Sequence, residues 1–311
     1  MLENYFNNKS IMDITNVVCY KKDILLQFYR EEVDRLIPSL SRLDYKKKAD
    51  SINKNVIANR DLLVAKAKKS ALFENWDTST LLECILMIYY TSYVVMLESR
   101  NKVWSYEYMT FSRRIGELWE LFCKLCFSYP INNIQFYEPP LFEDVRNQLV
   151  TQIQRYVSNL PLGDEDKSTL NGYFDQVWNM VTSGEIQLKS DLHFTDGETR
   201  YVVDFKSGFG SNEKGNTNRL LMVAQIYQSL ATNYKCMIFV RSTENNHYLH
   251  TLQTSGIWDT STGSETYKRI YKYSGYDIER WININIDWMN DFEPEMARHI
   301  RDNNLESYLI W

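Results

Sequence analysis

The stretch that decides the fold reads SDLHF from Ser190 to Phe194, turns at Asp-Gly (196–197), and returns as YVVDFK from Tyr201 to Lys206. Successive residues of a strand point to opposite faces, so Asp204 and Lys206 share one face of the second run. Asp-Gly between two such runs is typical of a β-hairpin, because both residues readily adopt positive φ. The pattern predicts a hairpin that brings Asp191 alongside Asp204.

This hairpin would gather two carboxylates and one ammonium at one point. Hard divalent cations such as Mg²⁺ use one or two carboxylates and keep several waters, which leaves room for a phosphate oxygen. A lysine beside that cation could orient or deprotonate the attacking water. The alternative is a surface hairpin with a cross-face ion pair. The apolar surroundings of Asp204 argue against it, because an isolated buried charge is costly.

The same residues resemble the PD-(D/E)xK nuclease superfamily, and within it the type II restriction endonucleases. Asp191 corresponds to the acid that enters the site, and Asp204-Phe205-Lys206 to the Asp-x-Lys of the next strand, while Ser190 stands where the motif has proline. The resemblance implies that Asp191, Asp204 and the Phe205 carbonyl bind Mg²⁺ and that Lys206 orients the water. It further implies site-specific cleavage of double-stranded DNA by a homodimer.

The superfamily supplies a further acid from a helix that precedes the hairpin. Here the expected helix runs from Thr110 to Phe127, and its apolar positions form a stripe with Glu120 at the edge. Gly116 followed four residues later by Glu120 reproduces the spacing that the family often shows. Glu117 is the alternative acid, and both could instead be solvated acids near a helix start. Gln225, on the helix after the hairpin, is a possible accessory residue.

The resemblance implies an α/β (α+β) fold: a restriction-endonuclease-like core with a mixed central sheet flanked by helices. The expected division is a helical N-terminal region over 1–109, with possible DNA-recognition or dimerisation elements, and a nuclease core with an aromatic tail over 110–311. Apolar spacing predicts helices through residues 12–128, including a central, nearly all-apolar helix that 78–80 could cap. Further elements are expected as helices over 143–160 and 219–232 and a buried strand over 235–241.

Charge is distributed unevenly along the chain. The formal net charge is −5, yet residues 42–69 hold nine basic and three acidic residues. That segment is therefore about +6 within an otherwise acidic chain, which suits DNA held locally rather than coated by a broad basic surface. A solvated helical face is the alternative. The residues expected to contact DNA are Lys46, Lys47, Lys48, Lys189, Lys214 and Arg219.

Other features bound the location of the protein. No uninterrupted apolar run approaches the roughly 20 residues of a membrane span, and the N-terminus lacks the pattern of a secretory signal. Five scattered cysteines fit reduced thiols better than a disulfide framework. Cys123 and Cys126 have metal-ligand spacing, but they lie in an apolar helical run without a second pair. We therefore expect a cytoplasmic protein without a membrane partner.

Two other functions remain open from the sequence. A repair or recombination nuclease of the same superfamily, such as a junction resolvase or a RecB-like exonuclease, would use the same core. Resolvases are usually smaller and more basic, and the exonucleases show a fuller Gln-x-x-x-Tyr pattern. The third reading is a non-catalytic DNA-binding protein with a degenerate nuclease core. The joint presence of Asp191, Asp204 and Lys206 argues against degeneracy.

Overall fold

The computed structural model describes residues 21–179, 186–210, 214–230 and 233–311. The predicted helical residues 12–20, Cys19 and part of the loop after the hairpin lie outside this description. Contacts group the chain into two compact units. The first, which we call the helical unit, comprises residues 1–132 and 264–311, and the second, the sheet unit, comprises residues 133–263. Glu120 belongs to the helical unit, whereas Asp191, Asp204 and Lys206 belong to the sheet unit.

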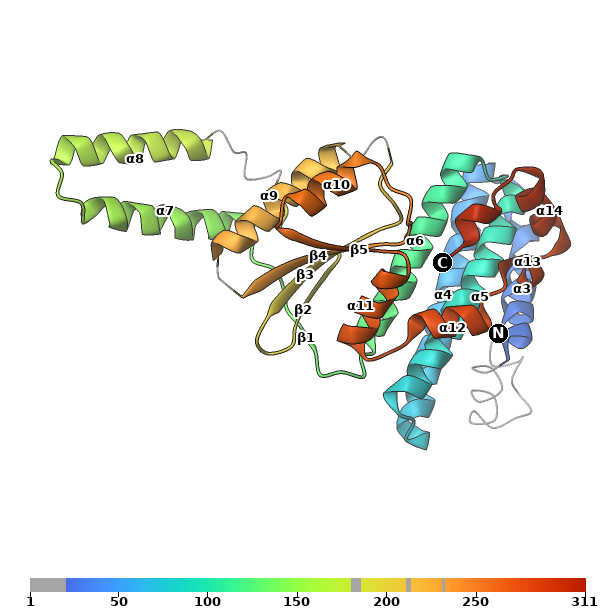
Figure 1. Cartoon of the computed structure of the whole chain (residues 1–311). Coiled ribbons are helices and arrows are strands. Elements are labelled where there is room, and N and C mark those ends of the chain that lie inside the picture. Colours follow the sequence, from blue (N-terminus) through green and yellow to red (C-terminus); the bar gives the residue numbers. More distant parts are fainter. Residues whose placement is uncertain (1–20, 180–185, 211–213, 231–232) are drawn as a thin grey trace. The chain divides into compact units, whose positions relative to one another are not determined.

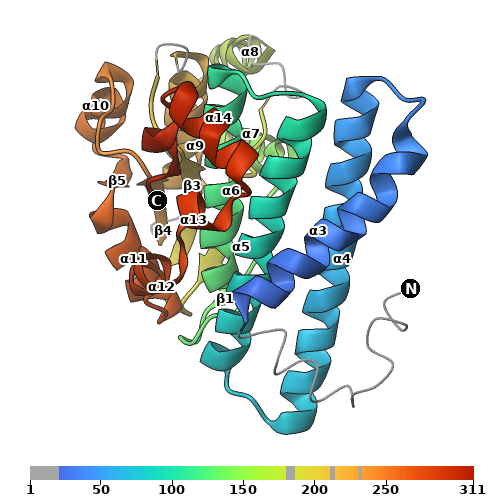
Figure 2. The ribbon, with the colours of Figure 1, turned by 90° about the vertical axis from the view of Figure 1, so that its right-hand side faces the viewer.

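The helical unit is built around long helices, of which α4 and α5 run side by side (Figure 2). Its described N-terminal elements are α3 (Lys22–Leu36), η1 (Ile37–Leu40), α4 (Tyr45–Glu74), α5 (Thr78–Val103) and α6 (Tyr108–Ser128). Its C-terminal elements are α11 (Ser264–Ser274), α12 (Ile278–Asn285), α13 (Trp288–Asp291), α14 (Pro294–Asp302) and η3 (Glu306–Leu309).

The central helix of this unit is α5. The side chain of Asp77 caps it by accepting the backbone N–H of Thr80 at 2.7 Å, so the cap lies one residue before the predicted stretch. Its length and composition would suffice to cross a membrane, but 78% of its most apolar window is buried inside the protein. This burial confirms the predicted central position and is typical of the core helix of a soluble protein.

Buried polar contacts attach the C-terminal segment to the long helices. Asp291 forms an ion pair with Lys22 at 2.9 Å and accepts the Tyr90 hydroxyl at 2.5 Å. The pKa of Tyr90 is raised by burial and by this neighbouring carboxylate. Trp281 and Trp288 of the aromatic tail are buried. The tail therefore contributes to the core, which is the default role for aromatic residues.

The sheet unit contains a five-stranded mixed sheet in the order β1-β2-β3-β4-β5. The pairs β1–β2 and β2–β3 are antiparallel, and β3–β4 and β4–β5 are parallel. The predicted mixed sheet is thus confirmed. The elements are β1 (Gln135–Phe136), α7 (Phe142–Ser158), α8 (Asp164–Asn179), β2 (Leu192–Thr195), β3 (Arg200–Lys206), α9 (Lys214–Leu230), β4 (Tyr234–Val240), α10 (His247–Thr254) and β5 (Trp258–Thr262).

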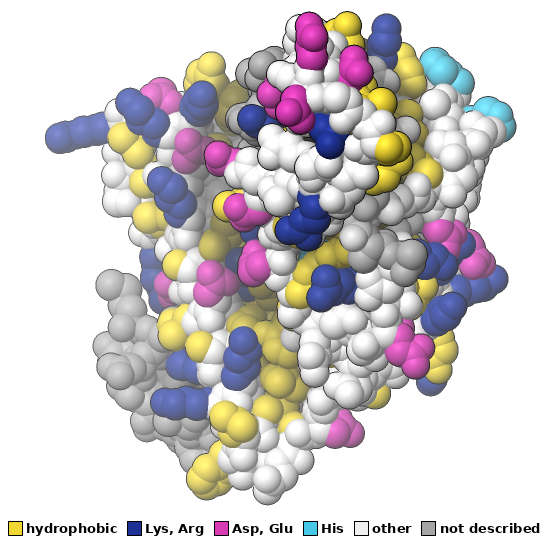
Figure 3. Space-filling view, turned by 90° about the vertical axis from the view of Figure 1, so that its left-hand side faces the viewer, with side chains coloured by type: hydrophobic (Ala, Val, Ile, Leu, Met, Phe, Trp, Pro, Cys, Tyr) yellow, Lys and Arg dark blue, Asp and Glu magenta, His cyan; other side chains and the backbone are white. Residues whose placement is uncertain are grey.

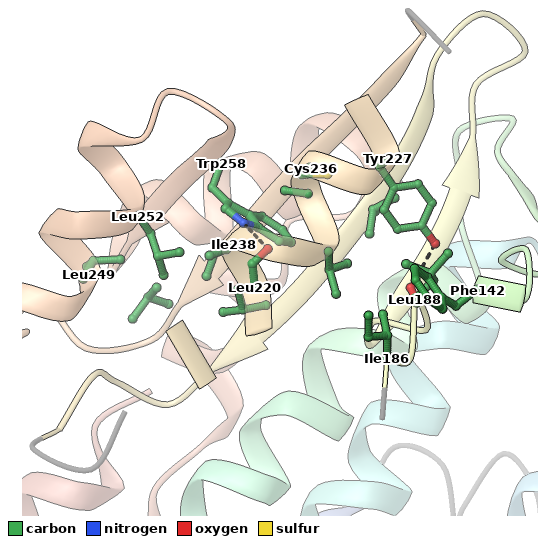
Figure 4. Packing of buried hydrophobic residues seen from close by; sticks show 14 of the residues in the cluster. Phe142, Ile186, Leu188, Leu220, Tyr227, Cys236, Ile238, Leu249, Leu252 and Trp258 are labelled. Carbon is green, nitrogen blue, oxygen red and sulfur yellow. Dashed lines mark hydrogen bonds between the residues drawn. The ribbon is translucent and has the colours of Figure 1, made fainter. Parts of the chain in front are cut away.

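One face of the sheet packs against α9 and α10. Val202, Ile238 and the α9 residues Leu220 and Tyr227 belong to one buried cluster (Figure 4). The Trp258 indole donates to the Leu220 carbonyl at 3.0 Å and the Tyr227 hydroxyl to the Leu188 carbonyl at 2.9 Å. Because Asp204 follows Val202 at a spacing of two, its side chain lies on this same α9-facing side.

Two expectations about the sheet unit need correction. Helix α9 begins at Lys214, not at Arg219, because Thr217 of its first turn is already packed into the protein at 2% exposure, a tertiary contact without a local apolar signal. The sequence also gave no signal for β5. Its polar composition, with Asp259 and two threonines, lacks the apolar run by which a buried strand is recognised. The segment is a strand because its backbone pairs in parallel with β4.

Helices α7 and α8 form a hairpin that projects away from the sheet (Figure 1). It leaves several large apolar side chains exposed, among them Leu141, Tyr156, Tyr173 and Val177. On the face of the molecule seen in Figure 3, basic and acidic side chains are interspersed. That face offers no continuous basic field to nucleic acid.

Cysteine chemistry departs in part from expectation. Cys123, Cys126 and Cys236 are buried and form no disulfide, and burial raises the pKa of Cys236 to about 12. Cys84 of α5, however, is disulfide-bonded, so the prediction of reduced thiols throughout is wrong. Sequence spacing could not reveal this bond, because disulfide pairing depends on the approach of segments that are distant along the chain.

Candidate active site

The β2–β3 hairpin positions the two predicted carboxylates. Leu192 pairs with Val203 in the antiparallel register, so Asp191 lies opposite Asp204 one step further on. Oδ2 of Asp191 accepts the backbone N–H of Phe205 at 2.8 Å. This hydrogen bond fixes the Asp191 carboxylate beside the end of β3. The turn that makes the approach possible contains Gly197 with φ of +101°, a conformation that favours glycine.

Asp204 is held by two cations. Its side chain is only 3% exposed; Nζ of Lys206 lies 2.5 Å from Oδ2, and Nη2 of Arg219 lies 3.5 Å from Oδ1. The Lys206 ammonium also donates to the Phe205 carbonyl at 3.2 Å. With its side chain 19% exposed, Lys206 connects the buried carboxylate to the surface of the unit.

The charges of this cluster shift one another's pKa values. Burial raises the pKa of Asp204; the Lys206 ammonium opposes this effect, and the Asp191 carboxylate adds to it. Burial alone would lower the pKa of Lys206, but attraction to Asp204 and Asp191 outweighs burial and raises it. Lys206 is therefore an ammonium at neutral pH in this arrangement. As such it can donate hydrogen bonds but cannot accept a proton.

The donor set fits a hard cation that retains its own waters. Within the described ranges, no three histidine, cysteine, aspartate or glutamate side chains gather closely enough to form a metal cage. Two opposed carboxylates and the Phe205 carbonyl remain, which is the sparse oxygen set that suits Mg²⁺. Asp191, Asp204 and Phe205 could thus hold this ion, provided that Lys206 shares Asp204 with it.

His193 has a positioning role that sequence reasoning missed. Nε2 of His193 accepts the backbone N–H of Ser190 at 2.9 Å, which orders the residues immediately before Asp191. Burial lowers the pKa of His193 to about 4, and the positive charge of Lys189 adds to this shift. The ring is therefore neutral at pH 7. Its place opposite Val202 was readable from the hairpin, but its hydrogen bond to Ser190 was not.

The residues predicted to contact DNA in this unit divide into two groups. Arg219 reaches Asp204 and so belongs to the carboxylate cluster, although the sequence predicted only a DNA contact for it. Lys189 and Lys214 are exposed, and so is Gln225, which was predicted only as a possible accessory residue. The approach of Arg219 depends on the packing of α9 across β3, a contact without a local sequence signal.

The remaining predicted residues lie in the helical unit. Glu120 of α6 is paired with Lys124 at 2.6 Å, and its side chain is 30% exposed. Glu117 is 42% exposed and pairs with both Arg113 and Arg114. The apolar stripe predicted for this helix is buried. Glu120 and Glu117 belong to the helical unit, and the carboxylate cluster belongs to the sheet unit. A role for either acid in the site therefore stays a prediction.

The basic residues Lys46, Lys47 and Lys48 occupy the first turn of α4. Asp44 caps this helix by accepting the backbone N–H of Lys47 at 2.9 Å, and its carboxylate lies 3.4 Å from the Lys47 ammonium. Lys46 and Lys47 are exposed and Lys48 is half-buried. They are thus available at the surface of the helical unit.

Comparison of the chain with protein-family models, with curated proteins and with solved structures finds no match.

Proposed function

We propose that the protein is a Mg²⁺-dependent endonuclease that hydrolyses phosphodiester bonds of double-stranded DNA at a specific site, as type II restriction endonucleases do. One observation carries the proposal: Asp191 and Asp204 oppose each other at the end of β3, and the Lys206 ammonium lies 2.5 Å from the buried member of the pair. Two acids and a lysine so placed are costly for stability. A role in chemistry explains why the chain brings them together.

Each residue of the cluster has a distinct task in this proposal. Asp191 and Asp204 bind the cation together with the Phe205 carbonyl, and the N–H of Phe205 holds Asp191 in position. The bound cation would stabilise charge that develops on the phosphate and lower the pKa of water. Lys206, kept as an ammonium by its carboxylate neighbours, donates to the phosphate or to the attacking water. Orientation of the water, rather than its deprotonation, is therefore the role we assign to Lys206.

The test is a digest of unmodified phage DNA and plasmid in buffers with Mg²⁺, with Ca²⁺ or with EDTA. We expect discrete fragments in Mg²⁺ alone, and protection of DNA that carries the cognate methylation. Lys206→Gln should lower cleavage by about 10²- to 10⁴-fold with a melting temperature within a few degrees of the wild type. Activity that merely follows the folded fraction of this variant would contradict the role given to Lys206.

Two outcomes would point to other functions. A continuous smear of products, or preference for DNA ends or junctions, would favour a repair or recombination nuclease of the same superfamily. DNA binding without any cleavage would favour a non-catalytic protein. The contacts of both Asp204 oxygens with cations are the observation that supports this second reading, since a purely structural ion-pair cluster would look the same.

Assembly and location are part of the proposal. A homodimer would match the two-fold symmetry of a palindromic site. Sedimentation of the free protein and of its DNA complex in Ca²⁺ tests this assembly. A cytoplasmic location suits the proposed DNA substrate, whereas the Cys84 disulfide is more typical of an oxidising compartment. Fractionation of the source cells tests the location.

A further inference from the structure

A pocket of about 550 Å³ lies in the helical unit, between α4, the end of α5 and the start of α6. Its volume is within the usual range for pockets that hold small molecules or single nucleotides. The residues that matter for its chemistry are Asn53 of α4, Arg100 and Trp104 at the end of α5, and Arg113 and Arg114 of α6. The neighbouring helices are seen in Figure 2.

The pocket contains a buried cation, Arg100, whose pKa is lowered by burial, although the Glu107 carboxylate partly opposes this shift. Arg100 is 6% exposed, and its guanidinium lies 3.9 Å from the ring centre of Tyr106 and 4.4 Å from that of Trp104. Its guanidinium donates a hydrogen bond to the Trp104 carbonyl. Among the described residues no carboxylate forms an ion pair with it. A guanidinium has five N–H donors, and the Trp104 carbonyl accepts from one nitrogen only, so other N–H groups can donate to an acceptor that enters the pocket.

The wall supplied by α4 contains an unused acceptor. Oδ1 of Asn53 is buried and has no hydrogen-bond partner within the described part of the chain. Buried polar atoms are normally satisfied, so such an atom in a pocket wall indicates a missing donor. Trp104, which lines the same pocket, is 39% exposed, and its ring meets the Tyr45 ring in a T-shaped contact with 4.9 Å between the centroids. Planar surface, acceptor and cation together are the elements that recognise a nucleobase.

The rim of the pocket is basic. The Arg113 side chain is 82% exposed, and Arg113 and Arg114 both pair with Glu117. Two positive charges thus face one negative charge, which leaves a net charge of about +1. On α4, Lys46 precedes the lining residues Ala49 and Asp50 by three and four positions, which places it on the same helix face. Lys46 and Arg113 can therefore meet a phosphate at the pocket entrance, although Asp50 offsets part of this charge.

We propose that this pocket binds one unpaired nucleobase of DNA, with its ring against Trp104, an exocyclic amino group donating to Asn53, and its phosphate near Arg113 and Lys46. The inference rests on the proposed function for the choice of DNA as the ligand. It assigns the helical unit the recognition of a base that leaves the duplex stack, a step in which stacking and hydrogen bonds offset the cost of unpairing.

A second pocket of the same unit provides the contrast. It has a volume of about 530 Å³ and is lined by Glu83, Asp277 and Arg280, so its acids exceed its bases. Such a lining repels phosphate. Arg280→Gln therefore removes the same charge as Arg113→Gln without touching the proposed base site, and it serves as the matched control.

The experiment measures binding of a mixed-sequence single-stranded oligonucleotide in EDTA, with free dAMP as a second ligand. We expect Trp104→Leu and Asn53→Leu each to weaken oligonucleotide binding about tenfold and Trp104→Phe to restore most of it. Arg113→Gln should also weaken binding, whereas its matched control Arg280→Gln should leave it unchanged. Asn53→Leu should weaken binding of oligo-dA more than that of oligo-dT, because thymine lacks an exocyclic amino group. Melting curves verify that each variant is folded.

Wild-type affinity in both Asn53→Leu and folded Trp104→Leu would overturn the proposal. Free dAMP that binds as tightly as the oligonucleotide would also overturn it, since the ligand would then be a mononucleotide rather than DNA. If no DNA is cleaved in Mg²⁺ while the Trp104 and Asn53 effects hold, the hydrolytic function fails and the base pocket stands.

Discussion

Each unit of the protein buries a carboxylate, and the two carboxylates are held in different ways. Glu98 of the helical unit, 1% exposed, accepts two hydrogen bonds from Arg30 at 2.7 and 3.0 Å and one from the backbone N–H of Glu293 at 3.0 Å. Asp204 of the sheet unit, 3% exposed, has one close contact with Lys206 and a long one with Arg219.

Under the proposed function, this difference distinguishes a structural acid, Glu98, from a metal-binding one, Asp204. Burial raises the pKa of both carboxyl groups, so burial alone does not distinguish them. Glu98 is saturated by planar, bidentate hydrogen bonding, which leaves little capacity for a ligand. Asp204 lies opposite a second acid, Asp191, at a strand end where Lys206 is partly exposed. A cation or a substrate phosphate can compete for such a site.

The largest expected effect is that of Asp204→Asn. Removal of one of two carboxylates from a metal site should lower cleavage in Mg²⁺ by about 10³-fold or more, since electrostatic stabilisation dominates phosphoryl chemistry. DNA binding in Ca²⁺ should remain, because one negative charge near the phosphate is lost. Timed digests beside a gel-shift titration measure both. Cleavage at the wild-type rate would show that Asp204 is as structural as Glu98.

The converse variant is Glu98→Gln. Breaking a buried ion pair by removal of one charge leaves Arg30, among the carboxylates that the structure describes, with only its longer 3.8 Å contact to Glu293 and should lower the free energy of unfolding by about 3 kcal/mol. Cleavage per folded molecule should stay within about twofold of the wild type. Urea unfolding gives the stability, and activity is normalised to the folded fraction. If Glu98→Gln lost activity without losing stability, Glu98 would not be a purely structural acid, and the contrast with Asp204 would be wrong.

The sheet unit was more predictable than the helical unit for a physical reason. Alternation and Asp-Gly are local signals, and they predicted the hairpin, the shared face of Asp204 and Lys206, and the approach of Asp191. The contact between Arg219 and Asp204 depends on packing of α9 across the sheet, which no local pattern encodes. The same holds for the pocket around Arg100, whose lining comes from three helices that are separated along the chain.

A smaller effect would test the prediction that an acid of α6 supports the proposed chemistry. We expect Glu120→Gln to reduce cleavage about tenfold, the scale of a group that orients a ligand or its water, and Glu117→Gln to reduce it less. Glu120 lies at the edge of the buried stripe of α6, whereas Glu117 is occupied by Arg113 and Arg114. Rates at saturating Mg²⁺ compare the two variants, and the reverse order would identify Glu117 as the helix acid.

The smallest expected effect concerns the contribution of the helical unit to DNA binding. It is measured as the salt dependence of the binding constant. Each phosphate contact contributes about 0.9 to the log–log slope. Lys46→Gln should reduce the slope by about that amount, because Lys46 lies on the α4 face that lines the pocket. Lys47→Gln should change it less, since Asp44 already pairs with Lys47.

Titrations at several salt concentrations measure both slopes. The cleavage rate of bound DNA should be unchanged in either variant, because the acids of the sheet unit are intact. Equal slopes for the two variants and the wild type would assign both lysines to a solvated face and leave Lys214, at the start of α9, as the basic residue to test next.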